Sequence, residues 1–340
     1  MLDERKAAIL RAVVEEYIDT AQPVGSAHVV RSSGVRVSSA TVRNDMATLE
    51  QEGYLRQPHT SAGRIPTEKG YRFFVDNLGA PVTLKGADAV QVRSFFDHAH
   101  GEIEQMLQDT SRLLGDLTSY AGVVVGAPPA EATVRSVQVV GLSATSAVVV
   151  AVLSNGAVEK HSMDLAQGPK ALQGGAGEER IAAASAHLAA HLVGAVRSGP
   201  VPIPKTGDAA TDALCALAVK ALGTDLGDDP EQVFVGGTSR IASAFDAIET
   251  VREVLGILEQ QYVVVTLLRD VIDRGLQVAI GTETGMAPLA DCALIVSPYQ
   301  VEGEPAGSIG VLGPARMDYP QALAAVAVVS NRLSQRLSEG

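Results

Sequence analysis

Tryptophan is absent from this sequence, and only 4% of its 340 residues are aromatic. Cysteine is also scarce, because Cys215 and Cys292 are the only two and neither belongs to a CxxC pair. A disulfide framework and a thiolate zinc site are therefore not expected. No apolar run approaches the roughly 18 residues of a membrane span, and no basic segment followed by an apolar stretch marks a secretory signal. The sequence predicts a cytoplasmic protein without a membrane segment.

An excess of positive charge is missing as well, since the formal net charge is −12. This argues against a protein that coats nucleic acid with its whole surface. The imbalance lies entirely after residue 78, however, and residues 31–72 alone hold seven basic and four acidic side chains. A small nucleic-acid-binding module on an acidic body shows this asymmetry, and so does an ordinary solvated basic face. The length predicts about two domains.

The first 78 residues carry the pattern of a winged helix-turn-helix. Apolar residues recur at helical spacing over residues 3–19, and a short second helix can begin at Ser26. A third helix is predicted from an N-cap at Ser38 or Ser39 to a stop at Gly53. One long helix followed by two short ones joined by a turn is the order of a helix-turn-helix unit.

The third helix is the candidate recognition helix. If its apolar residues Val42, Met46 and Leu49 face the core, helical geometry places Thr41, Arg43 and Asn44 on the outer side. Arginine pairs with guanine and asparagine with adenine, while hydroxyls and N-terminal amides bind phosphates. Three polar residues on an exposed helix can also be merely solvated.

A wing is predicted after the third helix. Residues 54–57 and 64–66 are short extended segments around the turn-rich residues 58–63, and Thr67 can cap a fourth helix. His59 and Arg64 are the candidate phosphate or minor-groove contacts of this wing. The full set of candidate DNA-binding residues is Ser38, Ser39, Thr41, Arg43, Asn44, His59, Thr60, Ser61, Arg64 and Lys69.

Two blocks of sequence resemble signatures of the heat-inducible transcription repressor HrcA family. The first comprises SSATVRNDMATLEQEGYL at residues 38–55 and PHTSAGRIPTEKGYRFFVDNL at residues 58–78. The second is GSIGVLGPARMDYP at residues 307–320. The resemblance implies a homodimeric repressor of chaperone operons of the dnaK and groE type. It further implies binding to the inverted-repeat operator CIRCE and modulation by the GroEL chaperonin.

Residues 79–340 predict an α+β body with a mostly antiparallel sheet. A long linking helix is expected over residues 88–119, and the resemblance implies a GAF-like domain with an inserted dimerisation subdomain at about 165–235. The expected fold is therefore a winged helix-turn-helix domain at 1–78 followed by a GAF-like α+β domain at 79–340. The predicted strands are residues 134–142, 146–153, 157–161, 233–235, 277–280, 293–296 and 308–311, with a hairpin turn at Asn155 and Gly156.

No catalytic, metal or cofactor constellation is evident in the sequence. His187 and His191 share a helix face but lack a third ligand, and the glycines from Gly303 to Gly313 do not spell GxGxxG or a Walker loop. The sequence therefore favours a DNA-binding repressor that is not an enzyme. The alternative is a ligand-sensing GAF-type regulator or an enzyme whose N-terminal winged helix serves as a protein-interaction module.

Overall fold

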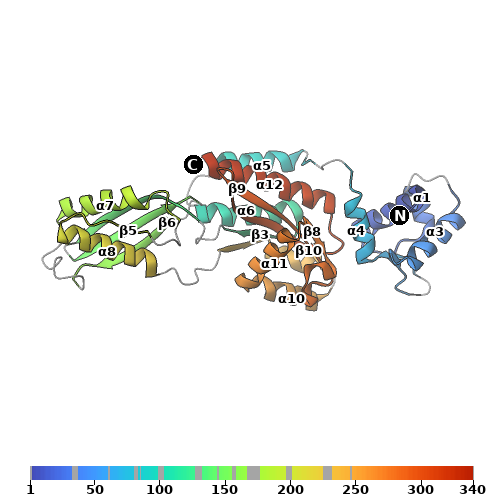
Figure 1. Cartoon of the computed structure of the whole chain (residues 1–340). Helices are drawn as coiled ribbons and strands as arrows, with labels where there is room; N and C mark the ends of the chain where they lie inside the picture. The colour runs from blue at the N-terminus through green and yellow to red at the C-terminus, as the bar shows by residue number, and fades with distance from the viewer. Residues whose placement is uncertain are drawn as a thin grey trace.

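The chain folds into an elongated α+β structure with a helical module at one end, a large sheet in the middle and a smaller sheet at the other end (Figure 1). No helix within the described part of the chain has the length and apolar character to cross a membrane. The computed structural model describes residues 2–32, 37–59, 62–79, 83–84, 86–98, 103–126, 132–143, 145–154, 158–166, 177–196, 201–224, 232–245 and 247–339.

The N-terminal module is the predicted winged helix-turn-helix. Side-chain caps begin three of its helices: Asp3, Ser38 and Thr67 each accept a hydrogen bond from a backbone amide of the first turn. The wing is a two-stranded antiparallel ribbon that ends where the fourth helix begins. The elements are α1 (Glu4–Thr20), α2 (Ser26–Ser32), α3 (Ser39–Gln51), β1 (Leu55–Arg56), β2 (Ile65–Pro66) and α4 (Glu68–Asp76).

The central sheet has five strands in the order β7-β3-β10-β9-β8, and every pair is antiparallel. Helices α5, α6 and α12 cover one face, and α9, α10 and α11 cover the other, so that each face is filled by an apolar cluster. The strands are β3 (Ala121–Val125), β7 (Val233–Gly236), β8 (Val278–Ile280), β9 (Cys292–Val301) and β10 (Glu304–Pro314). The helices are α5 (Ala87–His98), α6 (Ile103–Thr118), α9 (Thr238–Ala244), α10 (Ile248–Leu258), α11 (Gln261–Asp273) and α12 (Tyr319–Glu339).

Three features of this half of the fold differ from the sequence prediction. Strands β9 and β10 have 10 and 11 residues, whereas only 293–296 and 308–311 were predicted. Strand β3 was not predicted, although it lies between β7 and β10. The single helix expected over residues 88–119 is wrong, because α5 and α6 lie side by side and line one groove that includes both Gln91 and Asp116. Along one straight helix these residues would be about 37 Å apart. Folding back lets the apolar sides of both helices pack into the same core.

The smaller sheet, β4-β5-β6, is inserted in the chain between β3 and β7 and has its own apolar core. This core begins at Ala132, so the unit starts earlier than the inserted subdomain expected at about 165–235. The predicted turn at Asn155 and Gly156 lies outside the described residues. The elements are β4 (Val134–Ser143), β5 (Ser146–Leu153), β6 (Val158–Asp164), α7 (Glu178–Leu192) and α8 (Ala209–Thr224).

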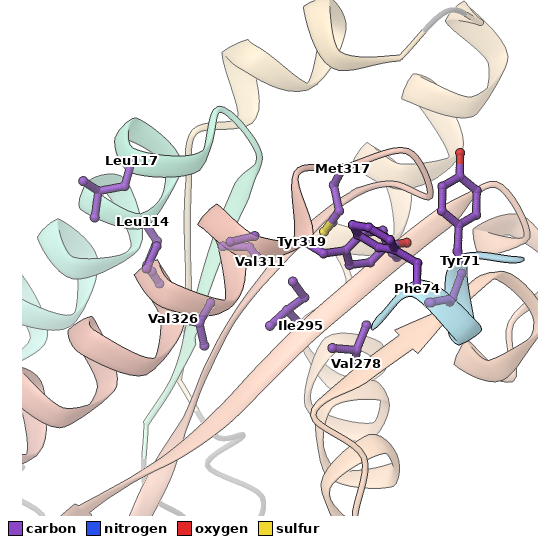
Figure 2. Packing of buried hydrophobic residues seen from close by; sticks show 14 of the residues in the cluster. Tyr71, Phe74, Leu114, Leu117, Val278, Ile295, Val311, Met317, Tyr319 and Val326 are labelled. Atoms are coloured by element: carbon purple, nitrogen blue, oxygen red, sulfur yellow. The ribbon is translucent and has the colours of Figure 1, made fainter. Parts of the chain in front are cut away.

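The winged helix packs directly on the central sheet through α4. Tyr71 and Phe74 lie against Tyr319 at the start of α12, with ring centroids 6.0 and 6.4 Å apart (Figure 2). Tyr319 is fully buried, and its hydroxyl donates to the Ala315 carbonyl oxygen at 2.6 Å. The N-terminal module therefore shares a continuous apolar core with one face of the sheet.

Candidate nucleic-acid interface

Helix α3 presents a buried face and a polar exposed face, as its sequence pattern predicts. Val42, Met46 and Leu49 are buried in the core of the module. Arg43 and Asn44 are exposed, and neither side chain forms an ion pair or hydrogen bond within the described part of the chain. Their guanidinium and amide groups are therefore available to an external partner, and contact with DNA stays a prediction.

The hydroxyl groups at the start of α3 already serve the local structure. Ser38 Oγ accepts a hydrogen bond from the Thr41 amide at 3.2 Å and lies 3.0 Å from Thr41 Oγ1. Ser39 Oγ lies 3.1 Å from Ser26 Oγ of α2. Of the Ser38 and Thr41 hydroxyls, one donates to the other, so the hydroxyl that accepts keeps its proton for a phosphate. Ser39 joins the two helices of the helix-turn-helix.

An ion pair that the sequence analysis missed fixes α3 against α1. Arg5 donates to both carboxylate oxygens of the buried Asp45, at 2.9 and 3.2 Å. The hydrogen bond and the charge of Asp45 raise the pKa of Arg5. Asp45 lies on the same helix face as Val42 and Leu49, and a carboxylate at a core position requires a cationic partner. That position was the signal available in the sequence.

The wing is held against α3 by Arg64. Its guanidinium contacts Glu50 Oε2 at 2.9 and 3.0 Å, and only 17% of the side chain is exposed. The Arg64 backbone also exchanges two hydrogen bonds of 2.9 Å with Val24. Arg64 therefore connects the wing to α3 and to the loop after α1, and its contact with a phosphate stays a prediction.

The remaining predicted contacts differ in their availability. His59 is exposed at the wing tip, whereas Thr60 and Ser61 lie outside the described residues. Lys69 is exposed, but its Nζ donates to the Glu52 carbonyl oxygen at 2.8 Å and lies 4.2 Å from the centre of the Tyr54 ring. Arg56 on β1 is exposed as well, although the sequence analysis did not select it. We therefore infer that Arg56 is the better candidate for a phosphate contact of the wing.

These placements predict opposite effects for two arginines of the wing. Arg64→Ala leaves Glu50 without its partner, so we expect a loss of about 1–3 kcal/mol in the free energy of unfolding and no change in the salt dependence of DNA binding. Arg56→Ala is expected to leave stability unchanged and to reduce the slope of log affinity against log salt by about 1 per subunit. Urea denaturation and binding titrations at several salt concentrations measure both quantities. A flatter salt dependence in a fully stable Arg64→Ala protein would contradict the assignment.

The described residues contain no group of three or more metal-ligating side chains. The His187 and His191 rings are tilted against each other with centroids 4.5 Å apart. His187 Nε2 lies 2.7 Å from the Pro204 carbonyl oxygen, and His191 Nδ1 lies 2.8 Å from the His187 carbonyl oxygen. Both cysteines are buried and unpaired, and burial raises the pKa of the Cys292 thiol to about 12, so this thiol is unreactive at neutral pH.

Comparisons with known proteins cover the whole chain. The family model described as HrcA protein C terminal domain matches residues 104–323. A protein of Nocardioides sp. named heat-inducible transcription repressor HrcA is 37% identical, with all of both chains covered. A protein of Moorella thermoacetica with the same name is 35% identical over 99% of this chain and 98% of its own. A crystal structure titled as that of a hypothetical protein has the same fold, with a TM-score of 0.69, 23% identity, and coverage of 100% of this chain and 99% of its own.

Proposed function

The chain belongs to the HrcA family of heat-inducible transcription repressors, and from this premise we propose that it binds an inverted-repeat DNA operator as a homodimer. Its relatives are named as repressors, which are not enzymes. The observation that carries the DNA-binding proposal is the exposure of Arg43 and Asn44 on a helix whose opposite face is buried in the core. In a helix-turn-helix protein this helix enters the major groove by its N-terminal residues.

Rigidity of the recognition helix supports sequence-specific reading. Contacts from α1, α2 and the wing hold α3 through Asp45, Ser39 and Glu50 respectively. Because three neighbouring elements hold α3, the helix cannot rotate about its own axis, and Arg43 and Asn44 stay on its exposed side. Because the backbone of α3 is already fixed, binding orders only the side chains of Arg43 and Asn44 and costs less conformational freedom.

A homodimer is supported by an apolar surface on the smaller sheet. Alternate residues of β5 are buried in the core that α7 and α8 share with this sheet, and the residues between them, on the opposite face, are only partly buried. Val140, Leu142 and Val158 are 44%, 64% and 50% exposed. Val140 pairs with Val148, and Val152 with Val158, across neighbouring strands. We call Val140, Leu142, Val148, Val150, Val152 and Val158 the outer valine face; Gln138 and Lys160 lie on the same side of the sheet, on either side of Val150.

We assign the outer valine face to a second copy of the chain. A two-fold dimer uses the same patch on both subunits, so an exposed valine-rich surface can pack against its own copy. A symmetric dimer also presents two winged helices related by the symmetry of an inverted repeat. The proposed operator is CIRCE in front of chaperone operons of the dnaK and groE type, by analogy with the family, and the proposed location is the cytoplasm.

A gel-shift experiment tests this function. The purified protein is titrated against a chaperone promoter fragment that carries the inverted repeat, and against the same fragment with one half-site scrambled. We expect tight binding to the first and binding at least 100-fold weaker to the second, because half the contacts are lost. Equal binding to both fragments would contradict the proposal. A melting shift with a small molecule and no selective duplex binding would favour the ligand-sensing alternative.

The proposed modulation by GroEL is a separate expectation from the family. We expect operator binding to fall after the protein is heated and to recover when GroEL is added during cooling. Binding that survives heating unchanged without the chaperonin would remove this part of the proposal.

A further inference from the structure

Two side chains of α4 connect the winged helix to the loop that follows β8. The Arg72 guanidinium contacts both carboxylate oxygens of Glu283, one of them at 2.9 Å from Nε, and also donates to the Val278 carbonyl oxygen at 2.7 Å. One helical turn earlier, Glu68 accepts hydrogen bonds from the Thr282 hydroxyl at 2.6 Å and from the Thr282 amide at 3.2 Å. We call Glu68, Arg72, Thr282 and Glu283 the α4 latch.

The loop between Ile280 and Gly285 is shaped to receive these side chains. The Ile280 amide donates to Glu283 Oε2 at 2.9 Å, which orients the carboxylate toward Arg72. Gly281 has a φ of 55°, and a Cβ atom built there would lie 2.3 Å from Glu68 Oε1. A larger residue would therefore displace Glu68 and strain the backbone.

The latch is ionised and partly shielded from water. Arg72 and Glu283 have 24% and 33% of their side chains exposed. Burial alone would raise the pKa of Glu283, but the Arg72 guanidinium and the Ile280 amide outweigh burial and lower it. At neutral pH the pair is thus charged, and a bidentate Arg–carboxylate contact fixes direction as well as distance.

Tyr71 and Phe74 of the same helix, α4, pack against Tyr319 (Figure 2), so the latch and an apolar contact act on one helix. The apolar contact holds α4 against the sheet, and the latch adds directed hydrogen bonds that fix the rotation of α4. The partners of α4 in the latch stand more than 200 residues later in the chain. The orientation of the winged helix is therefore set by these noncovalent contacts on the sheet.

We propose that Glu68 and Arg72 are positioning residues that hold each winged helix at a fixed angle to the central sheet, and so set the half-site separation that the dimer accepts. This proposal rests on the proposed function, because it requires a dimer that reads two half-sites. One added base pair rotates a half-site by about 35° around the duplex, so a rigid dimer discriminates sharply between separations. A dimer whose winged helices can rotate on the sheet binds operators with several half-site separations.

The test measures affinity for the native operator, for operators lengthened or shortened by one and two base pairs, and for a single half-site. For Arg72→Ala and Glu283→Gln we expect unchanged affinity for a single half-site and roughly tenfold weaker binding to the native operator. Changing the half-site separation should reduce their affinity much less than it reduces that of the unmodified protein. Arg72→Lys keeps the charge but loses the planar guanidinium that donates two hydrogen bonds to Glu283. Its dependence of affinity on half-site separation is expected to be intermediate. Arg112→Ala is the control, because it removes an exposed ion pair with Asp109 on α6.

A second readout is independent of DNA. Hydrogen exchange of the Thr282 amide should be slow in the unmodified protein and fast in Glu68→Ala, since Glu68 accepts that hydrogen bond. Fast exchange in the unmodified protein, or an unchanged separation profile in a folded Arg72→Ala dimer, overturns the latch. If the unmodified protein shows no preference for the operator, the proposed function fails and the positioning role with it, while slow exchange would still establish the contact itself.

Discussion

Operator affinity is expected to fall at least about 30-fold when Arg43 is replaced by alanine. A bidentate contact with a base contributes about 1–3 kcal/mol, and a two-fold dimer loses it twice, so the total loss is about 2 kcal/mol or more. The side chain is exposed and makes no contact within the described residues that stabilises the fold, so the free energy of unfolding should not change. Gel-shift titrations against the operator and against single-base variants measure affinity and selectivity together.

Gln51 supplies the matched control for this experiment. It is also exposed on α3, but it is the last residue of that helix and lies far from the N-terminal end. Gln51→Ala should bind like the unmodified protein, whereas Asn44→Ala should lose selectivity at a different base pair from Arg43→Ala. Full affinity and selectivity in Arg43→Ala would refute the role of α3.

Dissociation of the dimer is the second large effect that we expect, and Val148→Arg should produce it. Val148 lies on the central strand of the smaller sheet, opposite Val140 and Ser162, so a charge there disrupts the middle of the outer valine face. Binding of two linked half-sites gains roughly 100- to 10,000-fold over one. We expect a monomer in sedimentation experiments and operator affinity reduced to that of a half-site.

Val193→Arg is the control for the outer valine face. Val193 is exposed in the same unit but is the C-cap of α7, next to the residues that pair with the start of β4, and is not part of the outer valine face. This variant should remain dimeric with unchanged affinity. A dimeric Val148→Arg protein with full operator affinity would exclude the outer valine face as the interface.

Local signals made most of the fold predictable. Capping residues, stop glycines and apolar spacing located the helices of the winged module, and strand β5 was predicted over the residues it occupies. The errors arose where the apolar pattern of the sequence continues although the chain reverses direction or leaves a helix for a strand. The apolar stripe of residues 88–119 runs through both α5 and α6, and the short buried strand β3 follows that stripe without a period-two alternation.

The candidate site was predictable in its exposed residues and less so in its paired ones. Helical spacing was enough to place Arg43 and Asn44 outward, because the buried face of α3 is defined by its apolar residues. The pairing of Arg64 with Glu50 was not visible, since it depends on how the wing packs against α3. The contact of Arg72 with Glu283 joins residues 211 positions apart, and no local pattern reports such a pair.

The most direct test of the account combines the Arg43→Ala variant with operators in which single guanines are replaced by 7-deazaguanine, which lacks the N7 acceptor. If Arg43 reads a guanine in the major groove, the analogue at one position in each half-site weakens binding of the unmodified protein and has no further effect on Arg43→Ala. Equal losses for both proteins at every guanine would show that Arg43 does not read a base, and the proposed role of the exposed face of α3 would be wrong.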